Sequence, residues 1–300
     1  MKMHSKTSKR YPRVTLLVPC FDSMDHIGES IRCALAQTYG HVEIIVAPDD
    51  GCTYRHLRDT FKSPQLRIIP PGISPRSGPG ATRNRAIDAS SGDYFAMLDA
   101  DDFIPPNYIE ELMKVAMVEG AALAPTRYVT WDSRDAVRVP PIHNRLLSLS
   151  GFSQLLSSIH PLIHRSFESG YYGGFAEDVI HDGSVIAKLG TISIVDDVAY
   201  EIRIRSGSAC SSGSEAELKI QSAYAQRIEQ MLVRPTEIGL QGLSQHDRND
   251  FADLFRFRAM VSTEFSKSGS GSYNEWLAGN EAEFWDRFTA LRHETELRTS

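Results

Sequence analysis

The chain has 300 residues, of which 41% are apolar and 23% charged, so it is long enough to bury a substantial core as one large α/β domain with an appended segment or as two small domains. Its formal charge of −6, without a Lys/Arg stripe interleaved with aromatic residues, gives no electrostatic reason to bind nucleic acid. The four cysteines show neither a Cys-x-x-Cys pair nor the spacing of a zinc site, and a reducing cytosol is therefore the expected compartment.

The first residues, MKMHSKTSKR, are polar and basic, and no apolar signal core follows them. We therefore expect residues 1–12 to form a flexible N-terminus rather than a signal peptide. No run in the chain approaches the roughly 18 apolar residues that a membrane-spanning helix needs. The expected location is cytoplasmic, with any membrane contact peripheral.

Short apolar runs alternate with amphipathic stretches in the first part of the chain. Strands are predicted at residues 14–19, 42–47, 66–70 and 94–98, and helices at residues 24–39, 81–89 and 105–120. The strand runs are almost continuously apolar, which is typical of strands buried on both faces. The alternation predicts a mostly parallel sheet flanked by helices, in which ligands bind beyond the carboxyl ends of the strands.

Acidic residues directly follow three of these strands. They are Asp22 after the first strand, Asp49 and Asp50 after the second, and Asp99, Asp101 and Asp102 after the fourth. In extended backbone, side chains two positions apart share a face, so Asp99 and Asp101 are expected to converge while Asp102 points elsewhere. Such a carboxylate pair suits Mg²⁺ or Mn²⁺. Turn formation and helix capping explain an Asp-rich stretch equally well, and spacing alone leaves both interpretations open.

Three segments carry a family resemblance through their order along the chain. They are VTLLVPCFDSMDHIGESIRCALAQTYGHVEIIVAPDDG, GPGATRNRAIDASSGDYFAMLDADD and FAEDVIHDGSVIAKLG. Together they resemble the nucleotide-sugar glycosyltransferases of family two, over roughly residues 13–210. The resemblance implies an α/β GT-A fold, a Rossmann-like and mostly parallel sheet flanked by helices. It divides the domain at 13–213 into a donor-binding half (13–119) and an acceptor half (120–213), followed by a helical C-terminal extension (214–300).

The resemblance assigns the ends of the first two strands to the nucleotide. The family pattern of Pro, any residue, aromatic and Asn appears as Pro19-Cys20-Phe21-Asp22, with Asp in place of the usual Asn. These groups are expected to lie against the nucleotide. The paired acids Asp49 and Asp50 match the family turn in which one aspartate hydrogen-bonds the base, normally uracil.

Two further motifs match the diphosphate and metal side of the family's donor site. The family's Ala-Arg-Asn appears, stretched by one residue, around Arg83, which the resemblance places on the nucleotide and its phosphates, a role that suits a planar and permanently charged donor. Asp99-Ala100-Asp101 matches the metal motif. It implies Asp101 as the direct ligand of Mn²⁺ or Mg²⁺, with Asp99 on the ribose or the metal.

The acceptor side of the resemblance lies at the start of a predicted helix. Transfer to an alcohol with inversion needs a carboxylate that accepts the hydroxyl proton, and the resemblance makes Glu177 and Asp178 the acidic pair, with Asp178 as the base. The alternative is that Asp178 only stabilises the helix N-terminus. The preceding aromatic stretch 171–175 shares a loop with this pair and is therefore the predicted acceptor-facing segment.

One departure from the family concerns two arginines. Many members carry Tyr-Arg-x-His after the strand TISIV, whereas this chain has Ile202-Arg203-Ile204-Arg205, so Arg205 replaces the His. Arginine cannot bind a metal ion but can bind phosphate through two hydrogen bonds, and Arg203 and Arg205 are therefore predicted on the diphosphate. The alternative is a surface arginine on a flexible Ser/Gly loop. That loop, residues 206–214, is a predicted lid.

The C-terminal extension reads as helical. Helices are predicted at residues 218–233, 249–265 and 273–297, with a flexible joint at 266–272. The last helix carries an apolar stripe made by Trp276, Phe284, Trp285, Phe288 and Leu291. We rank packing on its own domain first, homodimerisation second and membrane contact third, because the mixed charge lacks the basic bias of membrane-surface helices.

The function predicted from these features is a metal-dependent, inverting glycosyltransferase. Its donor is a nucleotide-diphosphate sugar, with UDP expected, and its acceptor is a hydroxyl of a glycan or lipid-linked glycan. Three alternatives stay open: a retaining transferase of the same fold that makes a small glycoside, a non-catalytic nucleotide-sugar-binding protein, and a calcium-stabilised adhesion module. The separation of the carboxylates, which distinguishes the two stereochemical outcomes in glycoside chemistry, is not visible in the sequence.

Overall fold

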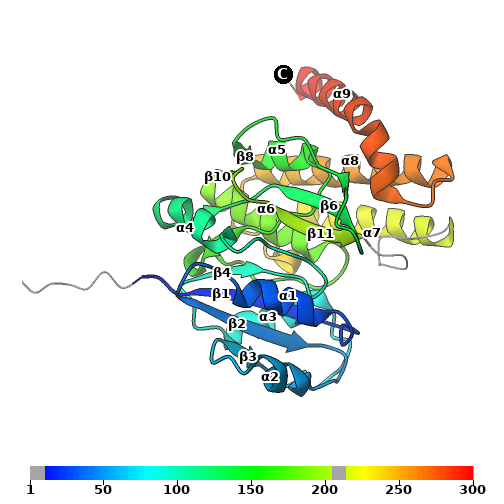
Figure 1. Cartoon of the computed structure of the whole chain (residues 1–300). Helices are drawn as coiled ribbons and strands as arrows, with labels where there is room; N and C mark the ends of the chain where they lie inside the picture. Colours follow the sequence, from blue (N-terminus) through cyan, green and yellow to red (C-terminus); the bar gives the residue numbers. More distant parts are fainter. Residues whose placement is uncertain (1–10, 205–213, 300) are drawn as a thin grey trace, which may run out of the picture.

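The computed structural model describes residues 11–204 and 214–299 (Figure 1). A six-stranded sheet has the order β3-β2-β1-β4-β9-β5. Its strands are β1 (Val14–Cys20), β2 (Val42–Pro48), β3 (Leu66–Ile68), β4 (Tyr94–Met97), β5 (Ala121–Ala122) and β9 (Leu162–His164). Strands β1, β2, β3 and β4 run parallel, and β9 is antiparallel to both β4 and β5. The mostly parallel sheet confirms the predicted α/β fold.

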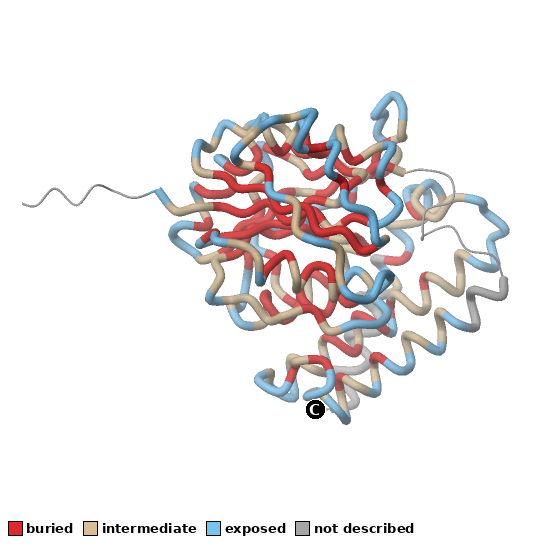
Figure 2. The backbone as a smooth tube through the Cα atoms, turned by 90° about the horizontal axis from the view of Figure 1, so that it is seen from below, coloured by how far each residue is buried: buried red, intermediate tan, exposed pale blue. Residues whose placement is uncertain are grey.

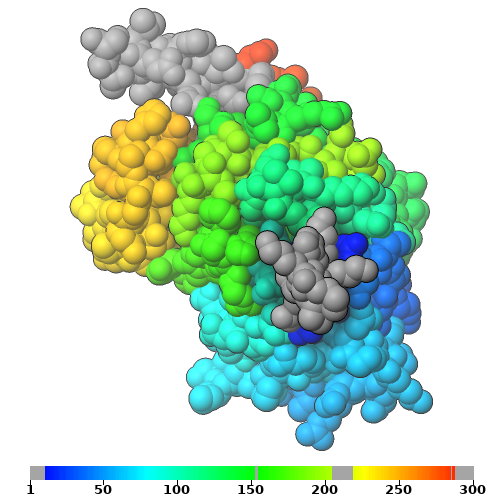
Figure 3. Space-filling model, turned by 90° about the vertical axis from the view of Figure 1, so that its left-hand side faces the viewer, coloured from blue at the N-terminus to red at the C-terminus, as the bar shows by residue number. Residues whose placement is uncertain are grey.

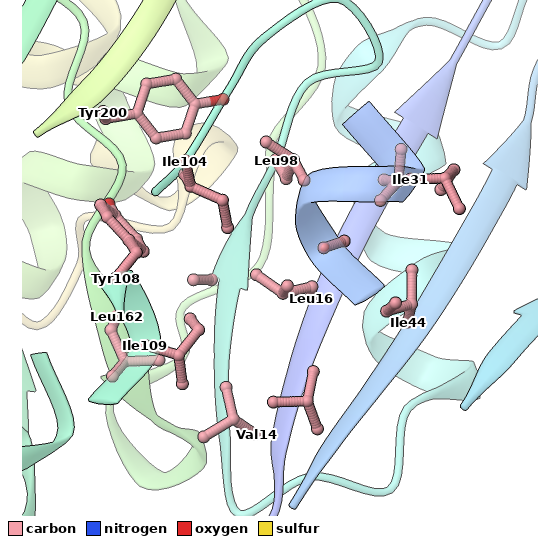
Figure 4. Close-up of a cluster of buried hydrophobic side chains, with 14 of the residues drawn as sticks. Val14, Leu16, Ile31, Ile44, Leu98, Ile104, Tyr108, Ile109, Leu162 and Tyr200 are labelled. Atoms are coloured by element: carbon pink, nitrogen blue, oxygen red, sulfur yellow. The ribbon is translucent and has the colours of Figure 1, made fainter. Parts of the chain in front are cut away.

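Helices cover both faces of this sheet. They are α1 (Ile27–Leu35), α2 (Arg55–Phe61), α3 (Pro79–Ala89), α4 (Tyr108–Glu119) and α6 (Glu177–Leu189). Leu16 and Ile44 pack into one core with Ile31 of α1 (Figure 4). Leu17 and Ile45 face the opposite core, which α3 and α6 cover. Because both faces are covered, the strands are buried along most of their length, as Figure 2 shows in red.

The predicted acceptor half, residues 120–213, adds two small sheets, and of their strands only the one within TISIV is predicted from the sequence. Their strands are β6 (Thr126–Thr130), β7 (Ala136–Arg138) and β11 (Tyr200–Ile204) in one, and β8 (Leu146–Ser148) and β10 (Thr191–Ser193) in the other. The short helices α5 (Leu149–Gln154) and η1 (Arg165–Phe167) connect them. Phe103 forms an isolated antiparallel bridge with Glu201 of β11. This bridge fastens the acidic turn after β4 to the acceptor half.

The C-terminal segment packs on the acceptor half. It contains α7 (Ser214–Val233), η2 (Pro235–Ile238), α8 (Gln245–Ser268) and α9 (Tyr273–Thr299). In Figure 3, α7 and α8 lie beside the green acceptor half, away from the blue first strands. Gly183 of α6 makes this close approach possible, because a Cβ there would lie 2.1 Å from the Phe251 ring of α8. Phe251 and Phe255 belong to the same core as Leu17, so α8 completes the core behind the sheet.

The expected flexible joint at 266–272 is wrong in its first three residues. Helix α8 continues through Ser268 and ends at Gly269, which has the left-handed backbone that stops a helix. Helix α9 then turns back, and its Leu277 and Phe284 are buried against Phe257 of α8. This agrees with intramolecular packing for the first part of the predicted stripe. The side chains of its other members, Trp285, Phe288 and Leu291, lie outside the described residues.

A buried ion pair fixes α9 to the acceptor half. Arg138 of β7 is 1% exposed at its side chain, and its Nε lies 3.1 Å from the Glu281 carboxylate. We expect Glu281→Gln to lower the free energy of unfolding in urea by about 3 kcal/mol, because the Arg138 charge stays buried without its partner. The control Glu283→Gln removes an exposed pair with Arg287 on the same helix and should change it by less than about 0.5 kcal/mol. Equal effects would show that the buried pair adds nothing.

No helix in the described part of the chain combines the length and the apolar character needed to cross a bilayer.

Candidate active site

The ends of β1 and β2 are joined by the Asp50 carboxylate. It accepts hydrogen bonds from the backbone N–H of Asp22 at 3.0 Å, from that of Cys52 at 2.9 Å and from the Tyr54 hydroxyl at 2.6 Å. Burial raises the pKa of Asp50, but these hydrogen bonds outweigh it and the pKa is lowered. Asp22 has φ 50°, a left-handed conformation that Asp and Asn tolerate better than most residues. The predicted nucleotide residues at both strand ends therefore lie together.

Asp49 has a different task from its neighbour. It is buried, and its two oxygens accept from Ser77 N–H at 3.0 Å, Ser77 Oγ at 2.5 Å and Gly78 N–H at 2.9 Å. This fastens the loop before α3 to the end of β2. The same loop places the Arg76 guanidinium 5.4 Å from the exposed Phe21 ring, and Pro19 at the end of β1 is half-buried. The two aspartates thus hold two different loops at the end of β2.

Arg83 of α3 joins the two halves of the domain that the sequence analysis predicts, 13–119 and 120–213. Its Nη1 donates to Glu177 Oε1 at 2.6 Å and its Nη2 to Asp99 Oδ1 at 3.4 Å. The guanidinium is 5.4 Å from the Tyr171 ring. Burial and the Asp178 charge raise the pKa of Glu177, although Arg83 opposes them. Two acidic residues that the sequence assigned to different motifs are therefore held by one cation.

The segment Asp99-Ala100-Asp101-Asp102, which follows β4, does not continue the extended strand. Asp102 N–H donates to the Asp99 carbonyl at 3.1 Å, which closes a turn. Asp102 is consequently 2% exposed, with Oδ1 3.0 Å from Arg203 N–H. The expectation that Asp102 points away from Asp99 is wrong, because the two-residue periodicity holds only for extended backbone. Ala100 is buried and Asp101 is half-buried within the same turn.

His160 completes this acidic cluster. Ligand atoms of Asp99, Asp102 and His160 all lie within 4.8 Å of one another, and His160 Nε2 is 3.6 Å from Asp99 Oδ2. The ring stacks on Tyr200 at 3.8 Å, and Nδ1 is buried without a hydrogen-bond partner among the described residues. Two carboxylates and an imidazole fit Mn²⁺, and the carboxylates also suit Mg²⁺. His160 lies 58 residues beyond Asp102, and no spacing in the sequence links it to this motif.

Arg203 holds the turn at residues 99–102 through hydrogen bonds to Asp101 and Asp102. Its guanidinium lies between the rings of Phe103, at 4.2 Å, and Trp131, at 3.9 Å. Nη1 donates to Glu29 of α1 at 2.6 Å, and Nε donates to the Asp101 carbonyl. The buried side chain thus binds Glu29 and the turn, and its Nη2 is buried without a hydrogen-bond partner among the described residues. Arg205 and the predicted lid up to residue 213 lie outside the described residues.

The acidic pair at the start of α6 lies next to Arg83. Ala176, in a left-handed conformation, occupies the N-cap position, and Asp178 is the second residue of the helix, so Asp178 is not the capping side chain. Asp178 is half-buried and lines a small cavity of about 20 Å³, whereas Glu177 is buried. The other polar residues that line this cavity are Arg83, His160, Tyr171, His181 and Asp182. Its volume is close to that of one water molecule.

A second imidazole lies beneath the acidic pair and was not singled out from the sequence. His181 Nδ1 is 2.9 Å from Asp182 Oδ1, and Nε2 is 3.5 Å from Glu168 Oε1. The Tyr171 ring stacks on His181 at 4.0 Å. Burial lowers the pKa of His181, but the two carboxylates outweigh it and raise the pKa to about 9. Spacing offers one weak signal, since His181 and Asp182 follow Asp178 by three and four positions, on the same side of α6.

The raised pKa of His181 makes stability depend on pH. Its ordinary value is 6.5, so the stabilisation is fully present below about pH 6.5 and is lost as the pH rises through about 9. We expect the free energy of unfolding to fall by up to about 3 kcal/mol over this window. Urea titrations of His181→Gln should lose this slope, whereas His246→Gln, which changes an exposed histidine, should keep it. A parental slope in His181→Gln would assign the effect to another group.

The charged and titratable groups around His181 come from several elements. Asp182 and Asp178 belong to α6, Glu168 follows η1, and Tyr171 lies in the loop before α6. Lys188 donates to the carbonyls of Phe167 and Glu168 and thereby holds the segment that carries the Glu168 carboxylate. These groups are present in both the parent and His181→Gln. We therefore assign to His181 only the difference between the two proteins in how the free energy of unfolding changes with pH.

Comparisons with known proteins identify relatives of this chain. The signature of glycosyl transferase family 2 matches residues 15–176. The chain is 28% identical to the succinoglycan biosynthesis protein ExoO of Rhizobium meliloti (strain 1021), over 97% of this chain and 86% of that protein. A shorter match is 32% identical to chondroitin synthase of Escherichia coli and covers 36% of this chain and 16% of that protein.

Solved structures share the fold. Residues 1–349 of TarS from S. aureus, in complex with UDP-GlcNAc, give a TM-score of 0.64 at 17% identity, covering 86% of this chain and 74% of that one. The mannosyltransferase PcManGT from Pyrobaculum calidifontis, in complex with GDP-Man and Mn²⁺, gives a TM-score of 0.54 at 14% identity, covering 95% and 85%. At such identities the likeness concerns the fold alone.

A mostly parallel sheet with acidic residues at its carboxyl edge, near a helix that begins with a second acidic pair, is the fold of the GT-A glycosyltransferases. The family signature covers more than half of the chain, and the chain therefore belongs to glycosyl transferase family 2. The resemblance drawn from the three motifs is confirmed, and the protein is a transferase enzyme. The adhesion module and the non-catalytic binding protein are accordingly set aside.

Proposed function

We propose that this enzyme transfers a sugar from a nucleotide-diphosphate donor, with UDP as the expected nucleotide, to a hydroxyl of a glycan or lipid-linked glycan, with inversion and with the help of a divalent metal ion. The observation that carries this proposal is Arg83, which bridges Asp99 on the donor side and Glu177 on the acceptor side. The succinoglycan and chondroitin names of the relatives support a polysaccharide product. TarS with UDP-GlcNAc supports a UDP-sugar.

The donor would lie across the carboxyl ends of β1, β2 and β4. Phe21 and Asp22 offer a ring and polar groups to the base and ribose, and Asp50 fixes their position. Asp49 and Asp50 each keep acceptor capacity beyond the bonds described, because a carboxylate has about four lone-pair sites. Arg83 supplies a permanent positive charge for the diphosphate.

The metal ion would be held by Asp99 together with Asp101, as the family motif implies, or together with Asp102 and His160, which the fold brings within reach. When bound, it would offset the negative charge that develops on the departing diphosphate. The His160 ring, whose Nε2 lies 3.6 Å from Asp99 Oδ2, fits such an ion together with the carboxylates of the half-buried Asp99 and the buried Asp102. Because these groups repel each other or stay unsatisfied without a cation, donor and metal are expected to bind interdependently.

Asp178 would act as the base. Its carboxylate accepts the proton of the acceptor hydroxyl while the oxygen of that hydroxyl bonds to the anomeric carbon and the bond to the diphosphate breaks on the opposite side. Glu177 stays bound to Arg83 and so keeps the guanidinium next to the reacting groups. A positioned cation of this kind stabilises developing charge without reorganising during the reaction.

Calorimetric titration of UDP and of GDP, each with Mn²⁺ and again with chelator, tests the donor part of the proposal. We expect UDP to bind with Mn²⁺ and to lose affinity in chelator. Binding of GDP but not of UDP would identify GDP as the donor nucleotide. Binding that is unchanged by the chelator would contradict the proposed metal requirement. If neither nucleotide binds under either condition, the acidic edge is structural and the proposed donor site is wrong.

Substitution of the acidic turn identifies the carboxylates that hold the metal. We expect Asp99→Asn and Asp101→Asn each to weaken UDP binding in Mn²⁺ by at least ~10-fold while leaving binding in chelator unchanged. The exposed Asp88→Asn in α3 serves as the control and should bind as the parent does. Full UDP affinity in Asp101→Asn, together with lost affinity in Asp102→Asn, would show that Asp102 and not Asp101 binds the metal.

A further inference from the structure

The loop 171–176 leads directly into the acidic pair of α6, and the donor half holds its first residue. The Asn84 side chain of α3 donates to the Tyr171 carbonyl at 2.8 Å and accepts from the Tyr171 N–H at 2.8 Å. Asn84 follows Arg83, so the donor-side helix fixes both the guanidinium and the entry to this loop. The sequence prediction that this loop faces the acceptor rests only on its proximity to Asp178.

Arg227 of α7 holds the rest of the loop. Its Nε donates to the Phe175 carbonyl at 2.7 Å, and its Nη2 donates to the carbonyls of Gly173 at 2.8 Å and Tyr172 at 3.4 Å. Nη1 binds the Gln230 side chain at 3.0 Å. The side chain is buried, and in the described part of the chain it makes no ion pair with a carboxylate. A buried charge that donates hydrogen bonds to three backbone carbonyls of one loop fixes the shape of that loop.

Two glycines make this arrangement possible. Gly174 has φ +111°, and a Cβ there would lie 2.7 Å from Arg227 Nη2. Gly239, which follows η2 with φ +74°, leaves room for the Tyr172 ring, since a Cβ there would lie 2.2 Å from it. A side chain at either position would displace Arg227 or Tyr172. The loop therefore depends on residues from the C-terminal segment for its conformation.

The ring that this arrangement leaves exposed is Phe175. Tyr171 is buried between Arg83 and His181, and Tyr172 packs on Gly239, whereas Phe175 is 37% exposed. Its ring meets Tyr224 of α7 edge-on at 4.8 Å. An exposed and rigid aromatic ring offers an apolar surface to the C–H face of a sugar, at little cost in conformational entropy. It stands three residues before Asp178.

We propose that Arg227 is a positioning residue for the acceptor: it holds the loop 172–175 so that Phe175 presents its ring to a sugar of the acceptor beside Asp178. This inference rests on the proposed transfer function. It assigns part of the acceptor site to α7, beyond residue 176, where the family signature ends. The ligand class is a glycan with an exposed pyranose face, and the acceptor site is preformed before the donor binds.

The test separates acceptor use from donor binding. UDP affinity is measured by calorimetry in Mn²⁺, and transfer is measured as UDP release from UDP-hexoses in the presence of octyl hexosides. For Arg227→Ala we expect UDP affinity within ~2-fold of the parent and a kcat/KM for the acceptor that is ~100-fold lower. Phe175→Leu should raise the acceptor KM and leave UDP affinity unchanged. Phe175→Trp, which keeps an aromatic ring, should have the acceptor KM of the parent.

Guanidinium rescue tests whether the guanidinium group itself holds the loop, whereas the split between UDP affinity and acceptor kcat/KM separates this role from general destabilisation. Arg227→Ala leaves a space of the shape of the lost group, so millimolar guanidinium should restore transfer in this variant and not in Arg234→Ala, an exposed arginine just beyond α7. If Arg227→Ala does not fold, Arg227→Lys and Phe175→Leu carry the test. Parental acceptor kinetics in these variants overturn the inference. Failure of the parent to bind UDP instead counts against the proposed donor site.

Discussion

Asp178→Asn should lower kcat by about 10²- to 10⁴-fold while UDP affinity in Mn²⁺ stays that of the parent. The physical reason is that an amide cannot accept the proton of the attacking hydroxyl. Asn is well tolerated near helix N-termini, and Ala176 holds the N-cap position, so the start of α6 should survive the change. Calorimetry with UDP and initial rates of UDP release measure the two quantities separately.

The contrasting result is informative for Asp178. If the residue only complements the helix dipole, Asp178→Asn will keep its activity and lose less than about 1 kcal/mol of stability. Asp247→Asn in α8 is a matched control, because Asp247 also lies in the first turn of a helix, within the capping box of Ser244. It should leave transfer unchanged. Normal transfer in Asp178→Asn would move the base to another residue.

Arg83→Met should abolish UDP binding and lower the free energy of unfolding by about 3 to 5 kcal/mol, because Glu177 and Asp99 would keep their charges beside an apolar side chain. The ion pair with Glu177 has side chains that are only 11% and 8% exposed, so water cannot replace the guanidinium. Urea unfolding and calorimetry with UDP in Mn²⁺ measure the two effects.

A double substitution separates the two roles of Arg83. Adding Glu177→Gln to Arg83→Met removes the unpaired carboxylate and should recover part of the lost stability without recovering UDP binding. Recovery of both would mean that Arg83 serves only the fold. The exposed arginine Arg67, which lies 3.5 Å from Glu43 with its side chain 50% exposed, gives a control in Arg67→Met with little change in either quantity.

The sheet and its acidic edge follow from local sequence patterns. Continuous apolar runs predicted β1, β2 and β4 to within a residue or so, because strands covered on both faces need such runs. Helix α2 and, apart from β10 within TISIV, the short strands of residues 120–204 are too short to show a detectable period. The joint at 266–272 was placed too early, because Ser and Lys are accepted in the last turn of a helix and only Gly269 stops α8.

The site was predicted in part for the same reason. Residues that directly follow a strand or begin a helix, such as Asp50, Asp99 and Asp178, are visible in the sequence. The turn at Asp99 brings Asp102 toward Asp99 instead of away from it. The hydrogen bond that closes this turn, from Asp102 N–H to the Asp99 carbonyl, leaves no periodic pattern in the sequence. His160 and Arg227 reach the site from elements that pack on it, and neither stands in a motif.

The sequence by itself determined the order of strands and helices, the acidic residues at the carboxyl edge of the sheet and the family, because each is written in contiguous residues. Only the tertiary structure decided which charged groups meet. Arg83 and Glu177 are 94 positions apart, Asp102 and the backbone of Arg203 are 101 apart, and Arg227 binds carbonyls up to 55 positions away. Such contacts depend on how the acceptor half and α7 pack on the sheet, and packing is set by the shape of many side chains together rather than by a local period.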